Sequence, residues 1–286
     1  MAKNQHKPAV PVRRAKGRLL IIGGHEDKTK EKRILRELAD RVGAGKLVVA
    51  TVASRQAKDI WLEYRKIFKG LGASNLAHLQ IEGRADATAE KQLGILRGAA
   101  GIFFTGGDQL KITSELGGTP VCAAIQELYD EGGIIAGTSA GASVMSETML
   151  VSGASDDSPR IGEMVRMAPG FGFVRSFTID QHFAERGRMG RLLAVVGQNP
   201  KYLGIGIDEN TAVLVESEER FRVFGDGAVY VLDGQDITGT NFAEKEPART
   251  MSIYDVKVHV LSDGDAFSIQ ERRPFRLEGR RRRKAA

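Results

Sequence analysis

Cysteine is almost absent from this sequence of 286 residues. The single cysteine, Cys122, cannot form an internal disulfide, and no cysteines and histidines show the spacing of a zinc site. Long apolar runs are also missing: stretches such as residues 19–22 fall far short of the roughly 20 residues that a membrane-spanning helix needs. The basic N-terminal segment lacks the apolar core of a secretory signal. We therefore expect a cytoplasmic protein with no disulfide, no metal and no membrane partner.

Positive charge is concentrated at the two ends of the chain. The net charge is +6, but residues 1–18 hold six basic and no acidic residues, and residues 280–284 hold five more basic ones. The rest of the chain therefore carries five net negative charges. Proteins that bind nucleic acid usually place their basic residues on a folded face. We predict basic tails at 1–17 and 266–286 around a single domain at 18–265, without nucleic acid as the main partner.

Short apolar stretches alternate with amphipathic stretches through the first half of the chain. Five stretches are predicted as buried strands: 18–22, 46–52, 76–81, 101–105 and 133–137. Four stretches with apolar residues at helical spacing are predicted as helices: 30–42, 57–71, 88–97 and 121–129. Such alternation is typical of a parallel sheet with helices on both faces, in which ligands bind beyond the carboxyl ends of the strands. The first half therefore predicts a doubly wound α/β fold.

From about residue 174 the pattern changes to short strands separated by turns. These strands are predicted at 177–179, 204–207, 212–215, 221–224, 228–232 and 255–261. We interpret them as antiparallel strands that extend the same sheet in the C-terminal third of a mostly parallel α/β fold. In the last of them, the alternation predicts that Val258 and Val260 face inward and that His259 faces outward. After residue 265 the chain is charged and arginine-rich, and we expect disorder near its end.

The strongest signal for chemistry directly follows the fifth predicted strand. Residues 137–141 read Gly-Thr-Ser-Ala-Gly, the G-x-S-x-G pattern of a nucleophile elbow. Small residues at both ends let the backbone turn sharply and lift the Ser139 hydroxyl clear of the sheet. The backbone N–H of Ala140 would then point to where an oxyanion forms. Five such residues can also form a plain strand–helix turn, but their position after a strand favours a nucleophilic Ser139.

A nucleophilic serine needs a base, and the sequence offers five histidines. One lies in the basic N-terminal segment, one within an apolar strand, and one on the outward face of a strand. A fourth follows the first strand and remains a candidate for a supporting role. In this order they are His6, His78, His259 and His25. The fifth, His182, follows a predicted strand and the polar residues Asp180 and Gln181. We predict His182 as the base.

The third member of a triad is a carboxylate that fixes the tautomer of the imidazole. Residues 206–210 contain Asp208 and Glu209, which point to opposite sides of an extended chain, so only one can face the site. The residue pattern leaves both open. The order of an α/β-hydrolase, with Asp208 or Asp233 before His259, is disfavoured because the parallel strands lack the expected oxyanion loop.

Two further stretches place polar groups near the same edge of the sheet. Residues 105–109 follow the fourth strand; the N–H of Gly107 could supply a second oxyanion donor, and Gln109 could reach substrate. A phosphate-binding loop is the alternative, but no G-x-G-x-x-G or Walker lysine accompanies it. Three arginines after His182 could bind carboxylates through paired hydrogen bonds, or could form a solvated helical turn. They are Arg186, Arg188 and Arg191.

Together these motifs resemble those of the cyanophycinases, serine exopeptidases that share a family with the aspartyl dipeptidases. The resemblance rests on residues 104–109, 137–143 and 180–191, and it extends from about residue 23 to about residue 209. It implies a catalytic triad of Ser139, His182 and Glu209, and so selects Glu209 over Asp208. It also implies a substrate pocket lined by Gln109, Asp180, Gln181, Arg186, Arg188 and Arg191.

The resemblance also implies a substrate, cyanophycin, which is a poly-aspartate chain with arginine on each β-carboxyl group. The enzyme would release β-Asp-Arg dipeptides from the chain end through an acyl-enzyme, as a homodimer and without a cofactor. An acidic domain would attract this arginine-rich polymer at low ionic strength. Three rival hypotheses are an aspartyl dipeptidase for short Asp-X peptides, a binding protein with an inert serine, and a nucleic-acid partner that acts through its tails. The arginines that follow His182 favour the polymer-degrading enzyme over the dipeptidase.

Overall fold

The computed structural model describes residues 17–153, 160–161, 165–217, 220–244, 246 and 248–275. Residues 1–16 and 276–286, which hold most of the two predicted basic tails, lie outside the described residues. Within the described ranges, none of the helices combines the length and the apolar character required to cross a membrane.

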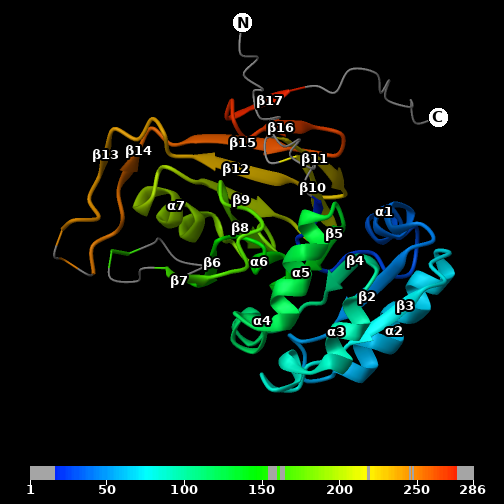
Figure 1. Ribbon diagram of the computed structural model, residues 1–286. Coiled ribbons are helices and arrows are strands. Elements are labelled where there is room, and N and C mark those ends of the chain that lie inside the picture. Colours follow the sequence, from blue (N-terminus) through cyan, green and yellow to red (C-terminus); the bar gives the residue numbers. More distant parts are fainter. Residues whose placement is uncertain are drawn as a thin grey trace, which may run out of the picture.

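A nine-stranded sheet forms the centre of the fold (Figure 1). Its parallel strands are β1 (Arg18–Ile22), β2 (Lys46–Ala50), β3 (Leu76–Leu79), β4 (Ala99–Phe104) and β5 (Ile134–Thr138). Its antiparallel strands are β10 (Thr211–Ser217), β11 (Arg220–Gly225), β16 (Ala266–Ser268) and β17 (Arg273–Phe275). The strand order is β17-β16-β11-β10-β1-β5-β4-β2-β3. The fold class predicted from the sequence, a mostly parallel α/β sheet with added antiparallel strands, is confirmed.

Helices cover both faces of the parallel strands. They are α1 (Arg33–Val42), α2 (Ala57–Gly70), the 3-10 helix η1 (Asp86–Thr88), α3 (Glu90–Leu96), α4 (Gln109–Leu116), α5 (Pro120–Asp130) and α6 (Ala140–Ser143). The remaining helix, α7 (Met189–Gln198), packs against a second sheet instead. Successive side chains of a strand point to opposite faces. Val49 and Phe103 accordingly pack with α1 and α2, whereas Val48 and Phe104 pack in the core that includes α3, α4 and α5. The sequence predicted one helix between β4 and β5, and the structure has two, α4 and α5.

A second sheet, of four strands, packs beside the antiparallel end of the first. Its strands are β8 (Phe177–Gln181), β9 (Leu203–Ile207), β12 (Val229–Asp233) and β15 (Lys257–Leu261), in the order β15-β12-β9-β8. We predicted that these strands would extend one sheet. They instead form a separate layer because Ile179, Ile205 and Val231 pack into the same core as Ile21 and Val213 of the large sheet. Strands β8 and β9 are parallel, so the segments that follow them leave at the same edge.

Two small hairpins complete the described fold. One consists of β6 (Thr148–Ser152) and β7 (Arg166–Pro169), and the other of β13 (Gly239–Thr240) and β14 (Ile253–Tyr254). Figure 1 shows β13 and β14 on the far side of α7 from the parallel strands. These hairpins lie outside the elements that carry the predicted site residues.

Two further details differ from the sequence prediction. Residues 266–275, which the sequence predicted as part of a tail, instead contain β16 and β17, which pair with each other and extend the large sheet beyond β11. In β15 the predicted faces are reversed: Val258 and Val260 are exposed, and the ring of His259 packs against Phe267. An edge strand can expose β-branched residues when its other side covers a core, so alternation alone does not reveal which side is buried.

Candidate active site

Ser139 occupies a sharp turn between β5 and α6. Its backbone has φ 53° and ψ −114°, a left-handed conformation that is costly for a residue with a side chain. The turn is held by the Ser139 N–H, which donates to the carbonyl of Ile22 at 3.1 Å. The loop after β4 lies directly against it, since a Cβ atom built on Gly106 would be 3.4 Å from the Cβ of Ser139. The local geometry is that of the predicted nucleophile elbow.

His182 follows β8, and its side chain points at Ser139. Its Nε2 atom lies 3.0 Å from Ser139 Oγ, and its Nδ1 atom lies 2.6 Å from Glu209 Oε1. The ring is buried, and a Cβ on Gly24 would be 2.3 Å from its Cε1 atom, so only glycine fits there. With Nδ1–H donated to Glu209, Nε2 is left to accept the proton of the serine hydroxyl. The structure thus brings together Ser139, His182 and Glu209, the three residues predicted as a triad.

Asp208 and Glu209 have different surroundings after β9. The Asp208 carboxylate is buried and accepts hydrogen bonds from the N–H groups of Ala184, at 2.9 Å, and Ala228, at 3.0 Å. It therefore holds two chain segments together and points away from the imidazole. Glu209 points the other way and contacts His182, as the opposite sides of an extended chain require.

His25 contacts the outer oxygen of the Glu209 carboxylate. Its Nδ1 atom is 2.8 Å from Glu209 Oε2, and its ring meets that of His182 edge-on at 5.0 Å between centroids. Burial lowers the pKa of His182, against the opposing effect of the Glu209 carboxylate. Partial burial acts to raise the pKa of Glu209, but the hydrogen bonds from His182 and His25 outweigh it and lower that pKa. At neutral pH the arrangement thus favours a neutral His182 beside an ionised Glu209.

The same three side chains are spaced like metal ligands. One ligand atom from each of His25, His182 and Glu209 lies within 4.8 Å of the others. An ion there would compete with the hydrogen bonds that orient the imidazole toward Ser139. The donor set therefore fits a hydrogen-bonded chain at least as well as a metal centre.

A cavity of about 580 Å³ opens in front of Ser139. It is lined by His25, Glu26, Lys28, Ile60, Tyr64, Thr105, Gly106, Gly107, Thr138, Ser139, His182 and Arg186. Gly107 has φ 143°, and a Cβ there would be 2.3 Å from the carbonyl oxygen of Ala53. Among the backbone hydrogen bonds of the described residues, the N–H groups of Gly107 and Ala140 have no acceptor. Both predicted oxyanion donors are therefore unoccupied.

The predicted substrate-binding residues separate into two groups. Arg186 lines the cavity, and Gln181 Oε1 lies 3.4 Å from Ser139 Oγ. Gln109 is the first residue of α4 and donates to the carbonyls of Leu150, at 3.4 Å, and Val151, at 3.3 Å. Gln109 is therefore engaged in holding β6, while Arg186 and Gln181 face the serine.

Asp180, Arg188 and Arg191 form a buried ion-pair cluster and do not line the cavity. Arg191 Nε is 2.6 Å from Asp180 Oδ2, and Arg188 also donates to Asp180 and to the carbonyl of Gln181. Burial lowers the pKa of Arg188 to about 10. The sequence predicted contact with substrate, but the aspartate is saturated by the two arginines, so the cluster instead fixes the strand end before His182.

We expect Asp180→Asn to destabilise the fold strongly. Removing one partner of a buried ion pair leaves uncompensated buried charge, which costs about 3–5 kcal/mol of the free energy of unfolding. Urea unfolding would measure this loss. The matched control is Asp236→Asn, which breaks the exposed pair with Lys257 and should cost less than about 1 kcal/mol. Equal losses in the two variants would contradict a structural role for the cluster.

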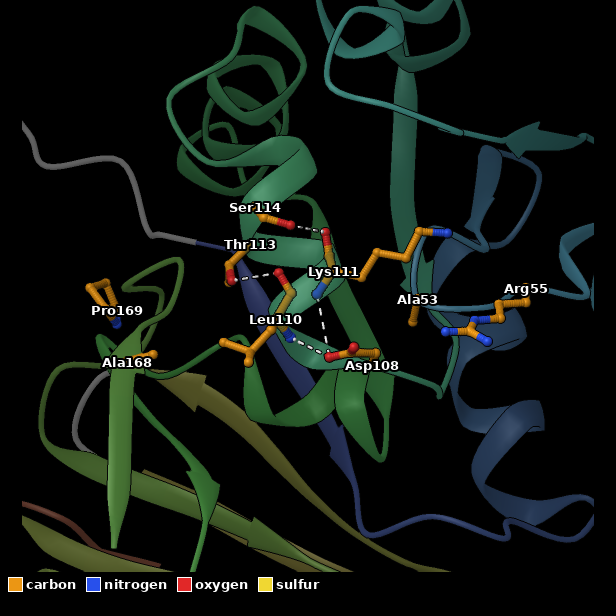
Figure 2. A pocket seen from close by; sticks show the side chains of 9 residues that line it. All are labelled: Ala53, Arg55, Asp108, Leu110, Lys111, Thr113, Ser114, Ala168 and Pro169. Carbon is orange, nitrogen blue, oxygen red and sulfur yellow. Dashed lines mark hydrogen bonds between the residues drawn. The ribbon is translucent and has the colours of Figure 1, made fainter.

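A second hollow, of about 650 Å³, borders the loop after β4 at Asp108 (Figure 2). Two of its polar side chains bond within helix α4 or at its start: Asp108 accepts from the N–H of Leu110 at 2.8 Å, and the Ser114 hydroxyl donates to the carbonyl of Lys111. None of the described residues that line it is a histidine. The cavity at Ser139 is therefore the candidate active site, although the other hollow is larger.

Sequence reasoning missed three residues on the wall of the active-site cavity: Glu26, Lys28 and Tyr64. Glu26 and Lys28 lie within three residues after His25, past the carboxyl end of β1, where ligands of such sheets bind. Their position at that end of the strand was the sequence signal that could have identified them as site residues. Tyr64 comes from the buried face of α2, where its spacing looks like that of any core residue.

Comparison with known proteins finds one matching family model and several relatives. The family model described as peptidase family S51 matches residues 19–223, which include Ser139, His182 and Glu209. The chain is 37% identical over 258 residues to a cyanophycinase of Synechococcus elongatus, covering 89% of this chain and 80% of the relative. It is 34% identical over 260 residues to a cyanophycinase of Geminocystis herdmanii, covering 90% of this chain and 95% of the relative.

Two solved structures share the fold. A peptidase from an acI-B1 Actinobacterium has a TM-score of 0.66 at 22% identity, covering 89% of this chain and 97% of that one. A putative peptidase E protein from Listeria monocytogenes has a TM-score of 0.54 at 17% identity, covering 74% of this chain and 100% of that one. At these identities the likeness concerns the fold alone.

Proposed function

Since this chain belongs to peptidase family S51, we propose that it is a serine exopeptidase that hydrolyses cyanophycin to β-Asp-Arg dipeptides. The observation that carries the proposal is the unbroken chain of contacts from Ser139 Oγ to His182, at 3.0 Å, and from His182 to Glu209, at 2.6 Å. The cyanophycinases that resemble this chain over most of its length support the choice of substrate.

The proposed reaction begins when His182 Nε2 takes the hydroxyl proton of Ser139 as Oγ attacks a backbone carbonyl carbon of the substrate. The N–H groups of Gly107 and Ala140 stabilise the oxyanion, and one such donor typically lowers the barrier by about 3 kcal/mol. Protonated His182 gives its proton to the leaving amine as the carbon–nitrogen bond breaks. Water then loses a proton to His182, its oxygen joins the acyl carbon, and the proton returns to Ser139 Oγ as the product leaves.

The charges around the site support a substrate with an exposed carboxylate. Arg186 lines the cavity and is exposed, and no acidic group of the described residues pairs with it. A guanidinium in this position can bind a carboxylate through two parallel hydrogen bonds. We assign Arg186 to a carboxylate of the terminal Asp-Arg unit, with Gln181 beside the nucleophile.

The experiment that tests the function is incubation of the purified protein with insoluble cyanophycin. Clearing of the suspension is followed by light scattering, and the products are identified by mass. Release of Asp-Arg dipeptide, absent with Ser139→Ala, is the expected result. Cleavage of short Asp-X peptides without clearing would make the protein an aspartyl dipeptidase, and no cleavage of either substrate would favour a binding protein.

The pH dependence of kcat/KM should report the ionisation of His182. Only the neutral imidazole can accept the serine proton, so activity rises with pH as His182 loses its proton. Because burial lowers the pKa of His182 below its ordinary value of 6.5, the midpoint of this rise is expected below pH 6.5. Circular dichroism at each pH controls for unfolding. A midpoint above pH 6.5 with the fold intact would contradict the assignment.

We also propose that the described elements form one catalytic domain that works in the cytoplasm as a homodimer. Multi-angle light scattering of the purified protein tests the oligomeric state, with a mass twice that of the 31.1 kDa chain as the expected result.

A further inference from the structure

Glu26 is a buried carboxylate on the wall of the active-site cavity. It is 4% exposed and follows β1 and His25. The Tyr64 hydroxyl donates a hydrogen bond to Oε1, and the Thr138 hydroxyl donates one to Oε2 at 2.6 Å. Burial and the negative charge of Glu26 together raise the pKa of Tyr64 well above its usual value, so the tyrosine stays a donor. Both carboxylate oxygens are thus held by neutral hydroxyl groups.

No cation among the described residues forms an ion pair with Glu26. Lys28, the nearest lysine in the sequence, pairs with Glu63 at 3.0 Å and lies over the ring of Tyr64. Carboxylates in protein interiors are normally paired with a positive charge, because loss of hydration is costly. An ionised carboxylate can accept about four hydrogen bonds, and hydroxyl donors fill only two of these positions. Glu26 therefore has both the charge and the acceptor capacity to bind a cationic group that enters the cavity.

The other candidate for this role is already neutralised. Asp180 was the carboxylate that the sequence predicted in the substrate pocket, but its oxygens are taken by Arg188 and Arg191. Glu26 differs because it lines the cavity and lacks such partners. Its contact with Thr138, the residue before Ser139, also links any group bound to it to the nucleophile through one peptide unit.

We propose that Glu26 is the specificity-determining residue that binds a guanidinium group of the substrate. The planar fork of a guanidinium matches the two remaining lone pairs of the carboxylate, whereas a neutral side chain would leave the buried charge unpaired. Tyr64 and Thr138 hold the carboxylate in the orientation that receives this fork. With Arg186 for a substrate carboxylate, the cavity would recognise a unit that carries both charges. This inference rests on the proposed function and identifies the residue that binds the arginine side chain of the substrate.

The test compares two ligands of the same shape, of which only one carries a positive charge. The dipeptide β-Asp-Arg and its neutral counterpart β-Asp-citrulline, in which a urea group replaces the guanidinium, are titrated by calorimetry into the Ser139→Ala protein. We expect β-Asp-Arg to bind about 10- to 100-fold more tightly, as for a hydrogen bond between charged groups. In the double variant with Glu26→Gln this preference should fall to less than about 3-fold. The matched control is Glu127→Gln, on the exposed side of α5, which should keep the full preference.

A merely structural role for Glu26 predicts a different result. If Glu26 only holds the turn at Thr138, its replacement weakens both dipeptides equally, and the inference is overturned. It is equally overturned if the Ser139→Ala protein shows no preference for arginine over citrulline. Should Glu26→Gln fail to fold, Tyr64→Phe provides a second variant: it removes one neutral donor but keeps the charge, so the arginine preference should persist. Loss of the preference in Tyr64→Phe would assign recognition to the tyrosine instead.

Binding and turnover separate the two proposals. The titrations need no hydrolysis, so they can succeed even if the wild-type protein fails to clear cyanophycin. A preference for β-Asp-Arg that depends on Glu26, without clearing, would contradict the proposed function but support the assignment of Glu26. A protein that clears cyanophycin but binds both dipeptides equally would keep the function and lose the assignment.

Discussion

Ser139→Ala is expected to lower kcat for cyanophycin hydrolysis by about 10⁴- to 10⁶-fold, the loss typical when a triad nucleophile is removed. The substitution removes only the oxygen atom that forms the acyl-enzyme. Because Ser139 already has an unusual backbone conformation in the turn, alanine must adopt the same φ of 53° and should leave His182 and Glu209 in place. Dipeptide release measured by mass over several days would quantify the residual rate.

Covalent labelling provides an independent check on this result. A fluorophosphonate should modify the wild-type protein once, at Ser139, and should not modify Ser139→Ala. Ser114→Ala is a matched control, because Ser114 is exposed on α4 and its hydroxyl bonds only within the helix. The Ser114→Ala protein should be labelled at Ser139 and should hydrolyse cyanophycin at the wild-type rate. A wild-type protein that clears cyanophycin but resists labelling, or a Ser139→Ala protein that retains its rate, would refute the assignment of the nucleophile.

Glu209→Gln should cause the second largest effect, about a 10³- to 10⁴-fold fall in kcat. The amide keeps the size of the side chain but cannot stabilise a positively charged imidazole. Its NH₂ group can also donate to Nδ1 of His182, which favours the tautomer that carries its proton on Nε2 and cannot accept one from Ser139. Initial rates of dipeptide release, measured together with KM, would show that the loss is in kcat.

The neighbouring carboxylate provides the matched comparison. Asp208→Asn weakens the hydrogen bonds from the Ala184 and Ala228 N–H groups, so we expect a loss of about 1–3 kcal/mol in the free energy of unfolding. Its kcat should change by less than about 10-fold, because Asp208 does not contact the imidazole. If instead Asp208→Asn abolished turnover and Glu209→Gln did not, the acid of the triad would be Asp208.

Local sequence patterns were sufficient to predict much of this site. The parallel strands, the turn at Ser139 and the position of His182 follow from strand and helix periods and from turn residues, which depend on a few neighbours along the chain. Parallel strands deliver their following segments to the same edge of a sheet, so Ser139 and the loop at Gly107 were expected to meet there. Ser139 and His182 do lie in contact. The choice of Glu209 over Asp208 came only from the family resemblance, and it is Glu209 that contacts the imidazole.

The tertiary structure alone decided the partners of the charged groups. Whether Asp180 faces substrate or Arg191, and whether a carboxylate after β1 is buried beside Tyr64 of α2, depends on how elements far apart in the sequence pack. The same holds for the second sheet. In the sequence its strands look like an extension of the first sheet, but in the structure the apolar faces of the two sheets pack into one core. The sequence by itself determined the local turns and which residue types could react. Packing determined which charges neutralise one another inside the protein. It also determined which charges, like that of Glu26, line the cavity without an ion-pair partner among the described residues.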